Sequence, residues 1–270
     1  MQKAPIKYFG GKGGMLNKLL PYFPPESEYQ VFIEPFCGSA VVALNIQNKP
    51  IIINDLNLNV YSLYTVLSDE EKYQKLVNKL DKVFYHEKIR EDMKKALKAK
   101  TIDDVQRAFA FFVVNRMSHN GVGGLSTTTL KRRDTSKSVA DFEHSKEQLG
   151  KVHQKLKKMI VLNRNGIDII RQYDRAGHFM YLDPPYHQST RTNARYEIDM
   201  NDQQQIELID TLLNVKKAKI LLSGYNNELY EKLELNGWHR HDFNVKTVDG
   251  QRRPKQKIES LWCNYNYLKD

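Results

Sequence analysis

The chain has 270 residues, enough to bury a sizeable core as one large domain or as a domain with an insertion. Its formal net charge of +10 favours a polyanionic partner, and nucleic acid is the commonest one. No apolar stretch approaches the roughly 20 residues that span a bilayer, and the first residues lack the apolar core of a signal peptide. The cysteines, Cys37 and Cys263, are too few for a disulfide framework or a cysteine-rich zinc site. These features favour a reducing cytosol.

The first part of the chain predicts one βαβ unit. Two short apolar, β-branched runs, at 31–33 and 51–53, each end at a polar residue, as buried parallel strands do. Residues 40–47 between them predict a helix.

The middle of the chain changes character. Residues 68–117 are charged and helix-like, 118–140 form a basic loop or hairpin rich in Gly, Ser and Thr, and 141–158 predict a further helix. Strand-like runs then resume at 160–162, 178–183, 220–223 and 258–268, and a helix pattern covers 202–214. The sequence therefore predicts an α/β fold that carries a helical, loop-rich insertion at roughly 65–150.

Small residues follow the first predicted strand, in Glu34-Pro35-Phe36-Cys37-Gly38-Ser39-Ala40. They allow a ligand to approach the backbone, and a helix that begins there would offer free N–H groups. The segment lacks the lysine of a P-loop and a full G-x-G-x-x-G. Asp55 ends the next strand about 20 residues later, where a carboxylate suits a ribose diol. Alone it would indicate a helix cap.

The segment Asp183-Pro184-Pro185-Tyr186 follows the apolar run 178–182. Two prolines stop a strand because neither can donate to its ladder. The segment thus places a carboxylate, a rigid pair of carbonyls and an aromatic ring at a strand's carboxyl end, where open α/β sheets bind ligands. This set suits a flat heterocycle with an exocyclic amine, whose two hydrogens Asp183 and a proline carbonyl can accept while Tyr186 stacks.

The order of these motifs resembles that of the Dam-type (D12 class, α-group) DNA adenine N6-methyltransferases. The matching segments are Tyr8-Phe9-Gly10-Gly11-Lys12, Glu34-Pro35-Phe36-x-Gly38, Asn54-Asp55-x-Asn57 and Asp183-Pro184-Pro185-Tyr186. The resemblance implies a Rossmann-like class I methyltransferase sheet with an inserted target-recognition domain. It implies S-adenosylmethionine as methyl donor and double-stranded DNA as partner, in the cytoplasm of a bacterium or of a phage's host.

Residue roles follow from the same resemblance. The catalytic domain would comprise residues 1–64 and 151–270, and the DNA-binding insertion residues 65–150. The residues that the resemblance assigns to the cofactor are Tyr8, Lys12, Glu34, Phe36, Gly38, Asp55, Asp168, Ile169 and Asp183. Phe36 and Gly38 would line the methionine part, Asp55 would hold the ribose, and Asp168 would accept from the cofactor's adenine amine. Asp168 as a plain turn residue is the alternative.

DNA contacts are expected in the basic and loop segments. Asn115-Arg116-x-x-x-Asn120-Gly121 is similar to the family segment that opens the target-recognition region. The predicted DNA-binding residues are Lys12, Asn120, Lys131, Arg132, Arg133, Arg191 and Arg252. Arg132 and Arg133 could read guanine edges or hold phosphates, so the recognition sequence stays open.

Several alternatives share part of this pattern. An RNA adenine methyltransferase would have the same cofactor site, a cytosine-N4 enzyme more often begins its motif with Ser, and a silent DNA-binding protein would not need Asp183. Cytosine C5 methylation requires a nucleophilic cysteine, usually in Pro-Cys, whereas Cys37 follows Phe36 and suits a small buried thiol. No histidine spacing indicates a metal. A cognate restriction enzyme is an open question.

Overall fold

The computed structural model describes residues 1–8, 10–128, 130–132, 134–186, 199–248 and 254–266. The chain forms two compact units. The first, called the helical unit, comprises Met1–Leu16, Gly38–Gln47 and Asn57–Asn163; the second, called the sheet unit, comprises Asn17–Cys37, Asn48–Leu56 and Arg164–Asp270. None of the described helices has both the length and the apolar character that crossing a membrane requires.

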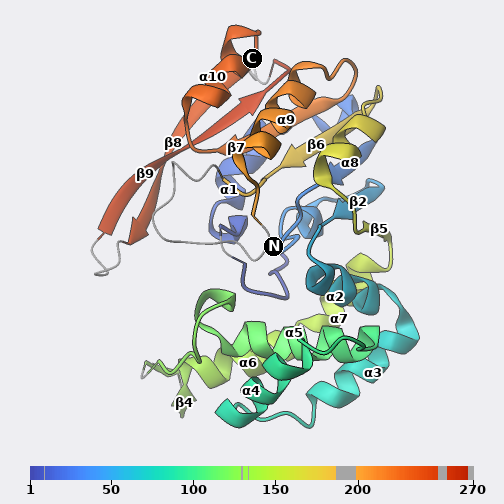
Figure 1. Ribbon diagram of the computed structural model, residues 1–270, viewed down its shortest axis with the longest axis vertical. Helices are drawn as coiled ribbons and strands as arrows, with labels where there is room; N and C mark the ends of the chain where they lie inside the picture. Colours follow the sequence, from blue (N-terminus) through green and yellow to red (C-terminus); the bar gives the residue numbers. More distant parts are fainter. Residues whose placement is uncertain (9, 129, 133, 187–198, 249–253, 267–270) are drawn as a thin grey trace. The chain divides into compact units, whose positions relative to one another are not determined.

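Six strands of the sheet unit pair side by side among the described residues. In their spatial order these are β2 (Ile51–Asn54), β1 (Val31–Glu34), β6 (His178–Leu182), β7 (Lys219–Gly224), β9 (Pro254–Cys263) and β8 (His239–Val248). The first four are parallel to one another, whereas β9 runs antiparallel to both of its neighbours, β7 and β8 (Figure 1). The predicted α/β fold is confirmed.

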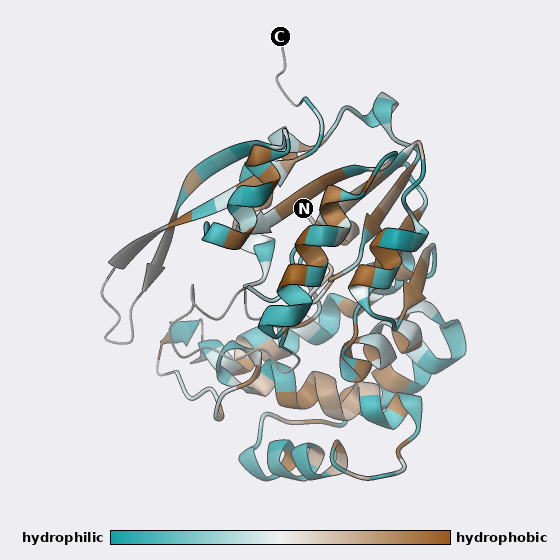
Figure 2. Ribbon diagram, turned by 45° about the horizontal axis from the view of Figure 1, so that its top comes forward, coloured by the Kyte–Doolittle hydropathy of each residue, from teal (hydrophilic) through white to brown (hydrophobic). Residues whose placement is uncertain are grey.

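Buried apolar side chains explain why these short runs form strands. Every residue of β2 is buried, as is the rest of β6 after His178, which is typical of parallel strands covered on both faces. Phe23 packs edge-on against Phe179 with ring centroids 4.9 Å apart. Hydrophobic colouring therefore concentrates on the central strands, whereas the surrounding helices carry both colours (Figure 2).

The helices of the sheet unit are short. They are α1 (Leu16–Leu19, with Leu16 counted in the helical unit), α8 (Gly166–Gln172), α9 (Asp202–Leu213) and α10 (Glu228–Leu235). Helix α9 packs against both α8 and α10. It begins with a capping box, because Asn201 and Gln204 exchange side-chain-to-backbone hydrogen bonds.

The helical unit is built around α5 (Asp104–Met117), which packs against four other helices. Its central residues, from Ala108 to Val113, are all buried. The other elements are α2 (Leu58–Ser68), α3 (Glu70–Leu80), α4 (Glu87–Ala96), α6 (Lys137–Glu147), α7 (Leu149–Leu156), β5 (Met159–Leu162) and the hairpin of β3 (Lys131–Arg132) with β4 (Thr135–Ser136). The middle of the chain is helical, as the sequence predicted, whereas its bounds as an inserted domain and its role in target recognition stay predictions.

The helix predicted at residues 40–47 is wrong. Only a 3-10 turn, η4 (Ala43–Asn45), forms there, and Ala40 has a positive φ of 51°, which a helix does not allow. The side chain of Asn45 exchanges two hydrogen bonds with the backbone of Gln2, which holds the segment in this shape. The helix N-terminus that the sequence predicted there, with its free N–H groups, therefore does not form.

Candidate active site

The parallel strands of the sheet unit bring polar residues to one edge. Glu34 ends β1, Asn54 ends β2, and Asp183 follows β6 directly. Because β1, β2, β6 and β7 run in the same direction, their carboxyl ends share one edge of the sheet. This is where the sequence predicted the ligand crevice.

A hydrogen-bond relay fixes the Asp183 carboxylate. The Ser223 hydroxyl on β7 donates to Asp183 Oδ1 over 3.0 Å, and the Tyr181 hydroxyl lies 3.1 Å from the same Ser223 oxygen. Burial, followed by the charge of Asp183, raises the pKa of Tyr181 well above its ordinary value. Tyr181 therefore stays protonated and can donate to Ser223, which leaves the Ser223 proton for Asp183.

The Pro185 carbonyl is held from α9. Gln205 is completely buried, and its Nε2 donates to the Pro185 oxygen over 2.6 Å. The Gln205 Oε1 accepts in turn from the Tyr230 hydroxyl over 3.1 Å. Both polar ends of a buried amide are thus satisfied, which sets the direction of the proline carbonyl.

Tyr186 is held at its tip and at its ring. Its hydroxyl donates to Glu259 Oε1 over 2.8 Å, and its ring meets that of Tyr225 edge-on at a centroid distance of 4.8 Å. Only 5% of Tyr186 and 3% of Glu259 are exposed. Three elements, β7, α9 and β9, thus each supply one polar partner to the four-residue motif.

At the carboxyl edge, the Asn54 side chain links the end of β2 to the loop that follows β1 and to the segment that precedes α8. Its Nδ2 donates to the Pro35 carbonyl over 2.8 Å and to the Arg164 carbonyl over 2.9 Å, and its Oδ1 accepts from the Arg164 N–H. Sequence reasoning emphasised Asp55 and missed this clamp. The sequence did hold a signal for it, namely an asparagine directly after the apolar run 51–53. An amide at the end of a buried strand is itself buried, as Asn54 is, and must find hydrogen-bond partners.

Phe36 lies against the start of α8. A Cβ atom on Gly166 would come within 2.4 Å of Phe36 Cε1, so the ring occupies the space that only glycine leaves open. Asn165 caps α8 through the Ile167 N–H, and Asp168 stands in the first turn with its carboxylate 3.4 Å from Arg171. The structure therefore brings together three of the predicted cofactor loops, those with Phe36, Asp55 and Asp168.

Cys37 is an unreactive thiol. It is buried, and burial, followed by the charges of Asp55 and Glu34, raises the pKa of its thiol well above the ordinary value. A thiol held in its neutral form is a poor nucleophile. This agrees with the interpretation of Cys37 as a small buried residue and disfavours cytosine C5 chemistry.

In the helical unit, Tyr8 packs directly on Gly38. A Cβ atom on Gly38 would lie 2.7 Å from the Tyr8 ring. The φ of Gly38, +44°, also favours glycine at this position. The Tyr64 hydroxyl donates to the Gly38 carbonyl over 2.7 Å. Lys12 is buried, and its ammonium donates to the Gly10 carbonyl over 3.1 Å.

Asn115 and Gly121 hold the N-terminal loop of the helical unit. The Asn115 side chain accepts from the Lys7 N–H and donates to the Lys7 carbonyl, both over 2.8 Å. A Cβ atom on Gly121 would lie 2.6 Å from the same Lys7 oxygen. Part of the segment expected to open the DNA-reading region therefore has a supporting role that the sequence did not reveal.

The predicted DNA-binding residues differ in exposure. Lys12 is buried, with 3% of its surface exposed, so in this structure its side chain does not present a surface contact for DNA. Asn120 is exposed in the 3-10 turn His119–Gly121, and Lys131 and Arg132 are exposed on β3. Arg132 already pairs with Asp141 over 2.8 Å. The predicted Arg133, Arg191 and Arg252 lie outside the described residues.

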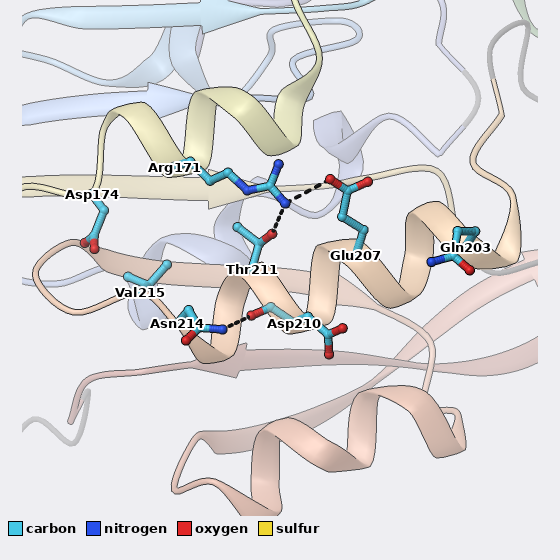
Figure 3. Close-up of a pocket in the computed structure, with 8 residues that line it drawn as sticks. All are labelled: Arg171, Asp174, Gln203, Glu207, Asp210, Thr211, Asn214 and Val215. Carbon is cyan, nitrogen blue, oxygen red and sulfur yellow. Dashed lines mark hydrogen bonds and ion pairs between the residues drawn. The ribbon is translucent and has the colours of Figure 1, made fainter.

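A separate pocket of about 470 Å³ lies between α8 and α9. Figure 3 shows Arg171 reaching across it to Glu207 and Thr211, over 2.8 and 3.0 Å. Asp174 precedes β6 and Val215 precedes β7, so this end of the pocket lies at the amino ends of those strands. It is therefore not the candidate site. No group of three metal-ligating side chains occurs among the residues that the structure describes.

Comparison with known proteins finds that the chain is similar to DNA methyltransferases. The family model of D12 class N6 adenine-specific DNA methyltransferases matches residues 8–253. The chain is 26% identical to the type II methyltransferase M.MjaIII of Methanocaldococcus jannaschii, over 96% of this chain and 98% of that protein. It is also 26% identical to the type II methyltransferase M1.LlaDCHI of Lactococcus lactis, over 94% and 90%. The DNA adenine methylase of Escherichia coli is 27% identical over 44% of this chain and 42% of its own length.

Proposed function

Since the chain belongs to the D12 class N6 adenine-specific DNA methyltransferase family, we propose that it methylates the exocyclic amine of an adenine flipped out of duplex DNA at a specific site. The observation that supports this proposal is the position and support of one four-residue motif. Asp183-Pro184-Pro185-Tyr186 stands at the carboxyl end of β6, and buried partners hold its carboxylate, a proline carbonyl and its tyrosine.

The adenine amine is a poor nucleophile, because its lone pair is delocalised into the ring. Asp183 and one proline carbonyl would accept hydrogen bonds from its two N–H groups and draw the nitrogen towards tetrahedral geometry. The Pro185 carbonyl already accepts from Gln205, so we assign the second acceptor to Pro184. Catalysis is then largely positioning and electrostatics, with no covalent intermediate on the enzyme. Tyr186 would stack on the flipped base.

S-adenosylmethionine would supply the electrophilic methyl group: its methyl–sulfur bond would break to leave a neutral thioether as the nitrogen–methyl bond forms, and the nitrogen would release one proton. The residues of the sheet unit fit such a ligand: Phe36 presents a ring beside Gly166, and Asp55 and Asp168 offer carboxylates for hydroxyl and amine groups. The further contacts that remain predictions are those of Tyr8, Lys12, Glu34, Gly38, Ile169 and Asp183.

The net charge of +10 supports DNA as the polyanionic partner. The exposed Asn120, Lys131 and Arg132 are the described residues that we propose as DNA contacts. Because two relatives are named as type II methyltransferases, we extend the proposal to a modification enzyme with a cognate restriction enzyme. We place its action in the cytoplasm of a bacterium or of a phage's host, where such DNA resides.

The test is methyl transfer from labelled S-adenosylmethionine to unmethylated genomic DNA, followed by single-molecule sequencing of modified bases. We expect N6-methyladenine at one short motif. Asp183→Asn keeps the shape of the side chain but removes its charge, so it should lose most of the rate while binding S-adenosylmethionine nearly normally. Asp210→Asn, at an exposed position on α9, is the matched control and should stay active. A near-normal rate for Asp183→Asn, or methylation of RNA instead of DNA, would refute the assignment.

A further inference from the structure

We propose that Glu259 is a positioning residue for methyl transfer: its buried carboxylate on β9 holds the Tyr186 hydroxyl and so fixes the ring that receives the flipped base. The proposal rests on the function proposed above. It assigns a role to a carboxylate that lies 73 residues away in the sequence from the motif it serves.

The sheet places Glu259 beside the motif. Strand β9 runs antiparallel to β7, and Ser260 is the partner of Gly224, the last residue of β7. Glu259 comes one residue before Ser260, and so lies past the last β7 residue, at the carboxyl edge. From there its Oε1 lies 2.8 Å from the Tyr186 oxygen.

Stability alone does not account for a carboxylate at this position. Glu259 is 3% exposed and precedes the buried residues Leu261 and Trp262, in a part of β9 where an apolar side chain would cost less to bury. A buried carboxylate needs hydrogen-bond donors, and Tyr186 provides one. The pair is therefore explained best by what it does to the tyrosine.

Two contacts with described residues restrict the Tyr186 ring. The hydroxyl bond fixes the tip, and the edge-on contact with Tyr225, at an interplanar angle of 73°, fixes the tilt of the ring plane. A ring held in this way is preorganised for stacking, because little freedom is lost when the base arrives. Without the tip contact, the base and its amine would be held less accurately against Asp183.

The experiment compares variants of the full chain in transfer, cofactor binding and base flipping. Glu259→Leu removes the acceptor, Tyr186→Phe removes the donor, and Glu259→Gln keeps an acceptor oxygen without the charge. A DNA duplex with 2-aminopurine at the target adenine reports flipping by fluorescence. Tyr265→Phe is the matched control, since the buried Tyr265 follows the end of β9 in the same unit and its hydroxyl donates to the Tyr22 carbonyl over 2.8 Å.

We expect Glu259→Leu and Tyr186→Phe each to lower kcat by about 10- to 100-fold, in line with the cost of misplacing a reacting group. S-adenosylmethionine affinity should stay within about twofold, and the double variant should be no worse than the worse single one. Glu259→Gln should recover most of the rate. If Glu259→Leu does not fold, Tyr186→Phe and Glu259→Gln carry the test.

Two outcomes would overturn the proposal. If Glu259→Gln is as slow as Glu259→Leu while Tyr186→Phe is fast, the site needs the charge of the carboxylate and not its hydrogen bond to Tyr186. If Tyr186→Phe transfers methyl groups at the normal rate, the contact has no role. Failure of the proposed function gives a different result, because the unaltered chain would then transfer no methyl group to DNA.

Discussion

Gly166→Ala tests the packing that forms the Phe36 side of the candidate site. The added methyl would lie 2.4, 2.5 and 2.9 Å from three atoms of the Phe36 ring, so the ring must retreat by about 1 Å to reach ordinary contact. Gly166 has no positive φ, and the cost is therefore steric rather than conformational. Gly166 is also the first residue of α8, where alanine is a better helix former than glycine.

The expected change in the free energy of unfolding follows from these two opposing effects, the steric overlap and the helix preference of alanine. Overpacking a filled site costs about 1–3 kcal/mol, and the helix preference of alanine returns less than about 1 kcal/mol. We expect a net loss of about 1–2 kcal/mol in the free energy of unfolding, measured by urea denaturation. Because Phe36 moves, S-adenosylmethionine affinity measured by calorimetry should fall about tenfold, equivalent to about 1.4 kcal/mol.

Two further variants make this test specific. Gly124→Ala adds the same methyl group where no atom lies within 4 Å, so neither stability nor cofactor affinity should change much. Phe36→Leu in the Gly166→Ala background should restore part of the stability, since a smaller side chain relieves the overlap. Unchanged stability and unchanged affinity in Gly166→Ala would refute the assignment of Phe36 to a cofactor pocket shaped by Gly166.

The remaining predictions concern the other supports of the site. Asn115→Leu leaves the Lys7 N–H and C=O without their side-chain partner and should cost about 2–4 kcal/mol of stability, visible as a lower melting temperature; an unchanged value would contradict the clamp. Burial, followed by the charge of Arg116, lowers the pKa of Lys7 to about 8 from 10.5, so the folded state binds fewer protons than the unfolded state between these pH values. The Lys7 contribution to stability should therefore rise as pH increases from about 8 to 10.5, and Lys7→Met should remove that slope in denaturation curves; equal slopes in both proteins would refute it. Gln205→Leu removes the side chain that pairs with the Pro185 carbonyl and the Tyr230 hydroxyl, so kcat should fall while S-adenosylmethionine affinity changes little. A normal kcat with weakened S-adenosylmethionine binding would instead place Gln205 at the cofactor.

The sequence by itself determined the strands and the chemistry at their ends. Apolar runs such as 51–53 and 178–182 are buried almost throughout, so a parallel sheet was the arrangement that could cover them. The two prolines after Leu182 set where β6 stops, and hence where Asp183 stands. Information of this kind lies within a few neighbouring residues.

Only the tertiary structure decided how the site is supported. Ser223, Gln205 and Glu259 reach the motif from positions 40, 20 and 73 residues away from their partners. Which polar side chain meets which depends on strand register, since a shift of β9 by one residue would turn Glu259 to the other face of the sheet. No local pattern encodes that register.

The same reason explains the wrong helix at 40–47. Its local composition allows a helix, but the hydrogen bonds between Asn45 and Gln2 join residues 43 positions apart and stabilise a turn instead. Asn115 and Lys7 are likewise 108 positions apart. A buried amide finds its partners only after the chain has folded, so the local sequence indicates that a partner is needed but not which residue supplies it.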